Sequence, residues 1–297
     1  MSAIRVIARL DIKGPNLVKG IHLEGLRVLG KPEDFAGRYY IGGIDELLYI
    51  DTVASLYGRQ NLLDIVKRAS QNIFIPLTAG GGVRTVDDIR QLLRAGADKV
   101  VINTGAIAKP EFIKEAARVF GSQCIVVSIA AKYRDNGKYE AFTDNGREKS
   151  GKDVLQWAAQ AVELGAGELL VTSIDREGTG KGYDIDLTRM IAQAVPVPVI
   201  ACGGAGRKEH CAQVIEEGSA DALCAASIFH YYRLKETTDG GQFQGEGNIE
   251  FIRNARGDLS FMNQRIQAVD VGTLKEYLIS KGIRCRYATT NQDEYAR

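Results

Sequence analysis

The sequence predicts an α/β protein in which residues 1–297 form a single (β/α)8 TIM barrel. Two observations predict this fold: eight short apolar runs alternate with amphipathic helical patterns, and the second half of the chain repeats the first. Alternating strands and helices are typical of parallel βαβ units, and a chain of 297 residues fits one such barrel. A doubly wound sheet is the alternative, but it would not readily explain two copies of equal length.

The predicted strands are rich in Val, Ile and Leu with little polar alternation, as expected when both faces are covered. They lie at residues 4–10, 46–51, 73–78, 99–102, 124–129, 168–172, 197–201 and 222–224. Helical patterns include residues 61–69, 86–94, 110–120, 153–164, 209–217 and 271–281.

The internal repeat is clearest after the third and seventh predicted strands. Residues 79–82 (Ala-Gly-Gly-Gly) match residues 201–204 (Ala-Cys-Gly-Gly), 122 positions later. The first strands of the two halves also match, and each is expected to end in a short polar turn. Asp11 ends the first strand, whereas Ala130 stands at the corresponding place in the second half. One of two potential acid/base groups at the strand ends is therefore missing.

Composition excludes several classes of function. The net charge of +1 provides no bulk field for nucleic acid or an anionic membrane, and no apolar stretch is long enough to span a bilayer. The N-terminus enters a strand without a secretory core, so a cytoplasmic location is expected. Five cysteines without a CxxC pair and only three histidines predict buried free thiols, with no metal site and no cofactor.

Two glycine-rich loops are candidate phosphate sites, because barrels bind ligands at the carboxyl ends of their strands. Glycine lets backbone N–H groups approach an anion closely. Each loop is followed, one strand later, by a loop carrying a hydroxyl group. One loop alone could be structural, but two at equivalent places imply a ligand with two phosphates. The first cradle contains Gly82, Asn103 and Thr104, and the second contains Gly204, Ala226 and Ser227.

The chain resembles the cyclase subunit of imidazole glycerol phosphate synthase, a barrel of histidine biosynthesis, over nearly its whole length apart from residues 231–267. The resemblance rests on residues 10–13, 18–20, 80–82, 96–99, 121–123, 172–176, 178–179, 203–206, 225–227 and 274–278. It adds Gly178 to the second cradle and implies that residues 18–20 belong to a flexible loop.

The resemblance also implies a glutaminase partner at the N-terminal face and passage of ammonia along the barrel axis. The family's gate of an Arg, a Lys and two Glu corresponds to Arg5, Lys99, Glu46 and Glu168, and its docking Asp corresponds to Asp98. Two acids and two bases from alternate strand starts would form a closed ring, whose burial is costly unless it serves a function. The alternative is that these charges simply cap the bottom of the barrel.

The family's chemistry implies two aspartates, as general acid and base, at the ends of strands one and five. Asp11 is the first, but Ala130 cannot titrate, and neither Ser128 nor Lys132 is a carboxylate. The alanine can be a natural divergence or an introduced inactivating change.

Further strand-end residues depart from the family or add charge. Arg9 shares the barrel-facing side of strand one with Asp11, where the family has a small residue. It would hold that carboxylate ionised or, alternatively, tilt outward to solvent. Glu177 replaces a family Asp, and Lys19, Asp51 and Asp175 are further charged residues near the strand ends.

Residues 231–267 form an insertion after strand eight, expected on the catalytic face. It is a disordered surface loop, or else a lid or docking surface for a third, amidating protein.

Three functions follow. The preferred interpretation is a diverged paralogue that conducts ammonia from a glutaminase toward sugar amidation in lipopolysaccharide or O-antigen synthesis. The alternatives are a true cyclase (lyase) of histidine biosynthesis and a non-catalytic activator of a glutaminase. The expected small-molecule ligand is a bisphosphate or a sugar phosphate.

Overall fold

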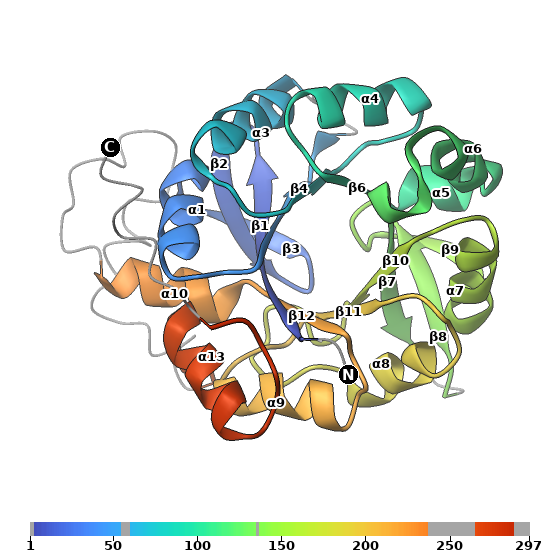
Figure 1. The fold of residues 1–297 in the computed structure, drawn as a ribbon. Coiled ribbons are helices and arrows are strands. Elements are labelled where there is room, and N and C mark those ends of the chain that lie inside the picture. Colours follow the sequence, from blue (N-terminus) through green and yellow to red (C-terminus); the bar gives the residue numbers. More distant parts are fainter. Residues whose placement is uncertain (1–2, 55–59, 135–136, 237–264, 288–297) are drawn as a thin grey trace.

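The computed structural model describes residues 3–54, 60–134, 137–236 and 265–287 and confirms the (β/α)8 barrel (Figure 1). Its eight parallel strands are β1 (Arg5–Lys13), β4 (Glu46–Asp51), β5 (Leu77–Gly80), β6 (Lys99–Ile102), β7 (Ile125–Tyr133), β10 (Glu168–Ser173), β11 (Val199–Cys202) and β12 (Ala222–Ala225). They follow one another around the barrel, and β12 pairs with β1. Because the ring is closed, the doubly wound alternative is wrong.

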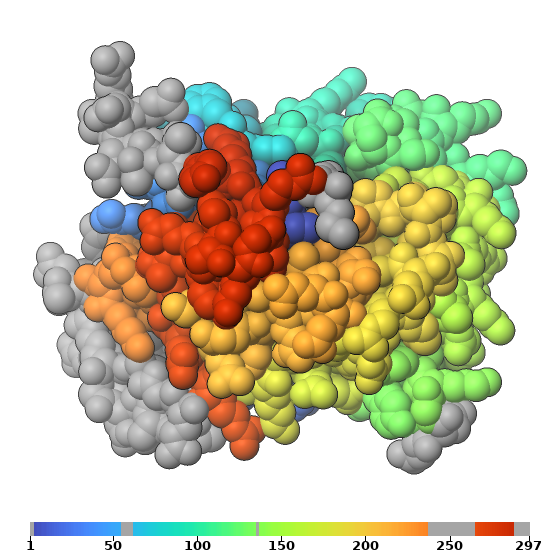
Figure 2. Space-filling view, turned by 60° about the horizontal axis from the view of Figure 1, so that its bottom comes forward, coloured from blue at the N-terminus to red at the C-terminus, as the bar shows by residue number. Residues whose placement is uncertain are grey.

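Helices cover the outside of the barrel. They are α1 (Pro32–Ile41), α3 (Gln60–Asn72), α4 (Val86–Arg94), α5 (Thr104–Ala108), α6 (Glu111–Phe120), α7 (Val154–Glu163), α8 (Ile185–Ala192), α9 (Lys208–Glu216), α10 (Ser227–Glu236) and α13 (Val271–Ser280), with a 3-10 turn at Ser122–Cys124. Figure 2 shows α9 and α13 side by side on the outer wall.

The third and seventh strands begin later than predicted. Pro76 and Pro198 precede β5 and β11, and each uses its carbonyl to accept a hydrogen bond from the neighbouring strand. Since proline has no N–H to donate, the regular ladder starts only after it.

The first strand of each half runs further than predicted and leads into a hairpin that was not predicted. β1 continues into a hairpin of β2 (Asn16–Ile21) and β3 (Glu24–Gly30), so residues 18–20 lie in a strand. β7 likewise continues into β8 (Tyr139–Thr143) and β9 (Glu148–Asp153). The two hairpins occupy equivalent places, which extends the internal repeat.

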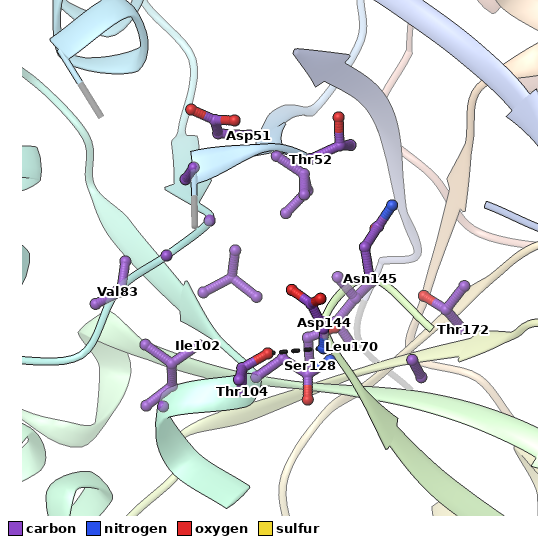
Figure 3. Close-up of a pocket in the computed structure, with 18 of the residues that line it drawn as sticks. Asp51, Thr52, Val83, Ile102, Thr104, Ser128, Asp144, Asn145, Leu170 and Thr172 are labelled. Carbon is purple, nitrogen blue, oxygen red and sulfur yellow. Dashed lines mark hydrogen bonds between the residues drawn. The ribbon is translucent and has the colours of Figure 1, made fainter. Parts of the chain in front are cut away.

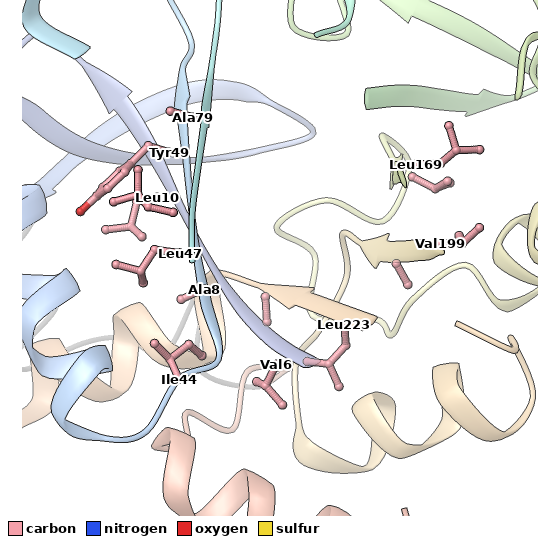
Figure 4. Close-up of a cluster of buried hydrophobic side chains, with 14 of the residues drawn as sticks. Val6, Ala8, Leu10, Ile44, Leu47, Tyr49, Ala79, Leu169, Val199 and Leu223 are labelled. Carbon is pink, nitrogen blue, oxygen red and sulfur yellow. The ribbon is translucent and has the colours of Figure 1, made fainter. Parts of the chain in front are cut away.

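Two apolar layers stabilise the barrel. The outer layer packs between strands and helices, and Figure 4 shows Leu10, Leu47 and Tyr49 within it. The inner layer fills the barrel axis with the side chains of Ile7, Leu48, Val101, Val126, Leu170, Ile200, Cys202, Ala222 and Cys224.

A buried ion pair connects the last helix to the N-terminal face of the barrel, here called the floor. Lys275 Nζ lies 2.6 Å from Asp45 Oδ1 and donates to Gly43 O at 2.6 Å. The other carboxylate oxygen of Asp45 accepts from Val6 N at 2.8 Å. One carboxylate therefore links α13 to β1.

The predicted insertion is only partly described. Residues 231–236 continue helix α10, so the chain does not leave the barrel directly after β12. Residues 237–264 lie outside the described residues. The described chain resumes at Arg265, and the N–H of Gln267 donates to Gly206 O at 2.7 Å beside the loop after β11.

The cysteines agree with the sequence prediction: all five are free, and four of them are buried. Among the described residues, no helix is both long and apolar enough to cross a membrane.

Helices α1 and α10 are joined by an aromatic cluster. The fully buried imidazole of His230 on α10 stacks on Tyr39 of α1 and meets the edge of Phe35. Tyr39 Oη lies 2.5 Å from His230 Nδ1. Burial, and to a lesser extent the charge of Lys19, lowers the pKa of His230 to about 3.

We expect His230 to make the protein acid-sensitive. Above pH 6.5 both states hold a neutral imidazole. As the pH falls from there toward 3, only the unfolded chain takes up the proton, so the free energy of unfolding drops by up to about 1.4 kcal/mol per pH unit. In urea titrations between pH 7 and 4, His230→Gln should show a shallower dependence than the unaltered protein. A His230→Gln variant whose free energy of unfolding falls as steeply with pH as that of the unaltered protein would contradict the prediction.

Candidate functional site

The four predicted gate residues meet at the floor of the barrel. Arg5 Nη1 lies 2.8 Å from Glu46 Oε2, and Arg5 Nη2 contacts Glu168 Oε1. Lys99 Nζ lies 3.0 Å from a carboxylate oxygen of each glutamate, which closes the ring. Thr78 Oγ1 donates to Glu46 Oε1 at 2.6 Å. Burial opposes the charge of Arg5, but Glu168 and Glu46 raise its pKa above the usual value.

The ring does not come from alternate strands, as the sequence analysis expected. Its residues begin the first, second, fourth and sixth barrel strands, so Arg5 and Glu46 are on neighbours. The register pairs Ile7 with Glu46, which places Arg5 below the glutamate and lets its guanidinium reach across the axis.

Asp98 lies on the floor with an exposed side chain and also has a structural role. Its Oδ2 accepts from Leu77 N at 2.8 Å. Asp221, at the equivalent place in the second half, accepts from Val199 N at 2.9 Å. The two aspartates thus make the same backbone contact at different places on the floor.

A pocket opens at the opposite end, here called the mouth (Figure 3). Val101 and Leu170 line its base, each two residues beyond a ring residue of the same strand. Because side chains two apart share a strand face, one apolar layer separates the pocket from the ring. Asp51 and Thr104 lie on opposite sides of the pocket (Figure 3).

The first cradle belongs to this pocket: Gly82, Asn103 and Thr104 all line it. Gly82 has φ +63°, and a Cβ there would lie 2.8 Å from Ala54 Cβ, so only glycine fits. Asn103 Nδ2 donates to Phe142 O at 3.2 Å, and Thr104 Oγ1 accepts from Asp144 N at 3.0 Å (Figure 3).

Two polar atoms at the pocket are buried without a partner among the described residues. They are Asn103 Oδ1 and Thr172 Oγ1. Buried polar atoms are rarely left unsatisfied unless a ligand or water completes them. Thr172 was not among the predicted site residues.

The second cradle is arranged differently. Gly204, Ala226 and Ser227 are buried, and among the described residues none of them lines the pocket. Gly178 lies beneath the β2–β3 hairpin, since a Cβ there would be 2.5 Å from Gly20 O. The structure therefore does not bring both cradles into this one pocket.

Arg9 points inward and pairs with Asp11, so the outward-tilted alternative is wrong. Arg9 Nε lies 2.8 Å from Asp11 Oδ1, and both side chains are buried. Burial opposes the charge, but Asp11, Cys202 and Glu177 raise the pKa of Arg9 well above its usual value. Arg9 Nη1 also donates to Cys202 Sγ at 3.5 Å. The Cys224 thiol and the Arg9 charge lower the pKa of Cys202 to about 7.

A second buried ion pair stands beside the first. Lys19 Nζ on β2 contacts Glu177 Oε1 in the loop after β10. Burial lowers the pKa of Lys19, but Glu177 and Asp11 outweigh it and the net shift is upward. Asp175 lies apart from this pair and accepts from Tyr133 N at 2.8 Å. Asp51 Oδ1 accepts from Val53 N at 2.9 Å at the rim of the pocket.

Ala130 lies in an apolar cluster with Leu23, Phe142 and Ile174 and is only 5% exposed. Leu23 comes from the turn of the β2–β3 hairpin, where it has φ +65°. The preceding His22 holds this turn in place, because its N–H donates to Glu177 O at 2.9 Å and its Nδ1 contacts Ile174 O at 2.8 Å. No sequence signal pointed to Leu23 or Phe142, because the hairpins that carry them were not predicted.

Comparison with known proteins shows which family this chain is similar to. The model of the family described as "Histidine biosynthesis protein" matches residues 5–235. A protein of Legionella pneumophila, the imidazole glycerol phosphate synthase subunit HisF, is 60% identical over 209 residues. That alignment covers 70% of this chain and 99% of the relative.

The apolar surroundings of Ala130 predict that a carboxylate there is unfavourable. Ala130 also lines the pocket at the mouth, but its side chain is 5% exposed and packs on Leu23, Phe142 and Ile174. We therefore expect Ala130→Asp to lower the free energy of unfolding by roughly 2 kcal/mol, because the new carboxylate would be poorly solvated. Burial should raise the pKa of that carboxyl, so the loss should deepen as the pH rises above about 4. Urea unfolding at pH 4 and 7 measures both effects. Ala130→Val controls for volume and should show no such pH dependence; an aspartate variant as stable as the unaltered protein at pH 7 would refute the expectation.

Proposed function

The chain belongs to the histidine biosynthesis protein family, and we propose that it is the ammonia-receiving barrel subunit of a glutamine-dependent amidotransferase. A glutaminase docks on the floor, and ammonia passes through the ring of Arg5, Glu46, Lys99 and Glu168 into the pocket at the mouth. The observation that carries this proposal is the short distance between ring and pocket, which a single apolar layer separates.

The apolar layer favours neutral ammonia over ammonium. Val101 and Leu170 offer no hydrogen-bond partner for a cation, and an unpaired charge there would be costly. The ring below is polar but fully paired, so one of its ion pairs must open for a molecule to pass.

The family comparison favours the imidazole glycerol phosphate synthase reaction over sugar amidation. This reverses the preference of the sequence analysis, because the relative at 60% identity carries the former name. Asp11 and the first cradle support this cyclase reading.

A second candidate, ammonia delivery to a different acceptor, is favoured by two observations at the mouth. Arg9 engages Asp11 in a buried ion pair, and Ala130 supplies no second acid or base. A third, amidating protein at the C-terminal face would then use the ammonia. A third candidate, a non-catalytic activator of the glutaminase, would require only the ring and the floor.

The equivalent aspartates Asp98 and Asp221 allow a matched test of glutaminase docking. Asp98→Asn and Asp221→Asn each neutralise a carboxylate that accepts the same backbone hydrogen bond. The two variants should therefore lower the free energy of unfolding by similar amounts. We expect only Asp98→Asn to weaken the complex with the glutaminase subunit of an imidazole glycerol phosphate synthase, by about tenfold or more. Isothermal titration calorimetry measures this affinity. Equal weakening by both variants, or by neither, would argue against docking at Asp98.

An assay with the family's bisphosphate ribonucleotide separates the two candidate reactions. With ammonium chloride as the nitrogen source, the cyclase candidate requires fast turnover. The second candidate requires slow turnover, because general acid/base catalysis lacks one partner. Ala130→Asp alone should not restore fast turnover, since Arg9 still holds Asp11. The Arg9→Ala/Ala130→Asp double variant should raise kcat by about a hundredfold, within the range of a general acid/base contribution.

The single variant Arg9→Ala is the control and should leave turnover slow. Cyclase-like turnover by the unaltered protein would eliminate the second candidate. In the active double variant, adding Lys99→Met should reduce glutamine-driven turnover more than ammonium-driven turnover if ammonia uses the ring.

A further inference from the structure

We propose that Cys202 and Cys224 form a redox-active pair inside the barrel, which hydrogen peroxide converts into a disulfide. The two thiols face each other on neighbouring strands, and the guanidinium of Arg9 lies beside one of them. The proposal goes beyond ammonia delivery and does not depend on it. It assigns Cys202 as the sulfur that attacks the peroxide and Cys224 as the sulfur that completes the disulfide.

The register of the barrel places the two cysteines side by side. Cys202 ends β11 and is the direct partner of Cys224 on β12. Both side chains belong to the inner apolar layer, so they point toward the barrel axis from the same face of the sheet. The Cys224 thiol hydrogen-bonds to the Cys202 sulfur. Two free thiols are therefore within bonding reach of each other.

The backbone spacing allows a disulfide between them. Neighbouring strands lie about 4.8 Å apart, within the range of about 4.4–6.8 Å that separates the Cα atoms of bonded cysteines. The Cβ atoms of parallel neighbours keep nearly the same spacing, which is wider than the usual separation of about 3.8 Å in a disulfide. We therefore expect a strained bond that a dithiol reductant breaks easily.

Arg9 makes the two thiols chemically unequal. Its Nη1 donates to Cys202 Sγ at 3.5 Å. The hydrogen bond from Cys224 and the charge of Arg9 outweigh burial and lower the pKa of Cys202 to about 7. Burial raises the pKa of Cys224 well above its usual value. Because the thiolate is the nucleophilic form of cysteine, Cys202 reacts first.

A small oxidant can approach Cys202 from the mouth. Arg9 lines the pocket and contacts the Cys202 sulfur, so this sulfur lies directly behind a side chain of the pocket wall. Cys202 is 4% exposed, whereas Cys224 is fully buried. Cys224 therefore suits the second step, in which its sulfur has to meet only Cys202.

Two other buried cysteines have different surroundings. Cys211 and Cys285 belong to the outer apolar layer, between the strands and the helices. Burial raises the pKa of Cys211 to about 12 and also raises the pKa of Cys285. Both thiols stay protonated at neutral pH and should react slowly, so they serve as internal controls.

The reaction balances with peroxide as its oxidant. The Cys202 thiolate attacks one peroxide oxygen, the O–O bond breaks, and the departing hydroxide takes up the proton that Cys202 had released. Cys202 is then a sulfenic acid. The Cys224 sulfur attacks the Cys202 sulfur, the S–O bond breaks, and the second hydroxide leaves as water with the Cys224 proton. The two sulfurs lose two electrons, and the peroxide gains them.

Peptide mapping of the full chain after peroxide treatment tests the proposal. N-ethylmaleimide present during unfolding blocks the remaining thiols, and trypsin cuts after Arg207 and Lys208, between the two cysteines. We expect the peptides of residues 190–207 and 209–233 to be joined, and dithiothreitol to separate them. Treated protein that yields these peptides unlinked would overturn the proposal.

Variants identify the bonded sulfur, because the second peptide also contains Cys211. Cys202→Ser and Cys224→Ser should each abolish the link, whereas Cys211→Ser should keep it. A link that survives Cys224→Ser, or one that Cys211→Ser removes, would refute the assignment.

The rate of oxidation tests the role of Arg9. Arg9→Gln should slow the loss of the Cys202 thiol at pH 7 by about tenfold, because less of the thiolate is present without the cation. Arg9→Lys keeps a positive charge and should react faster than Arg9→Gln. Equal rates in Arg9→Gln and the unaltered protein would contradict activation of Cys202 by Arg9.

Discussion

Charge buried inside this barrel has to be balanced by charge of the opposite sign, and that constraint governs both ends of the axis. At the floor, two cations and two carboxylates form a closed ring. At the mouth, the pairs Arg9–Asp11 and Lys19–Glu177 likewise place two cations beside two carboxylates. Removing one member of such a set leaves an uncompensated buried charge, which costs far more than the intact set contributes. The members are therefore coupled, and a change at one position alters what the others can do.

This coupling connects the two departures at the mouth. A small residue at position 9 would remove a cation, and an aspartate at position 130 would add an anion. Arg9 and Ala130 thus shift the charge of the mouth in the same direction, toward neutrality. Because position 130 carries no charge, Ala130 can pack on Leu23. An aspartate at that position would bury its carboxylate against the same leucine. The Asp11 carboxylate is held by the Arg9 guanidinium, and no second carboxylate stands at position 130.

The fold could be predicted from the sequence because its signals are local and repeated. The structure contains the predicted strands in short Val/Ile-rich runs and the predicted amphipathic helices. It also places residues 79–82 and 201–204 at equivalent strand ends. The ring residues were expected from the family resemblance. Which strands carry them could not be predicted, because the stagger of neighbouring strands determines which side chains lie at the same level. The hairpins after β1 and β7 escaped prediction. Their residues alternate weakly, and their pairing depends on contacts distant in sequence, such as His22 with Ile174.

The hairpins also explain why two halves of common sequence pattern became different. The β8–β9 hairpin follows β7 and borders the open pocket, with Asp144 bonded to Thr104 of the first cradle. The β2–β3 hairpin follows β1 and lies on Gly178 of the second cradle, and it brings Lys19 to Glu177. One hairpin therefore borders the pocket, while its counterpart covers Gly178 and carries one member of a buried ion pair. The two glycine turns have a similar backbone, because Gly82 and Gly204 both have positive φ. The difference between the two sides of the mouth therefore comes from the side chains of the two hairpins.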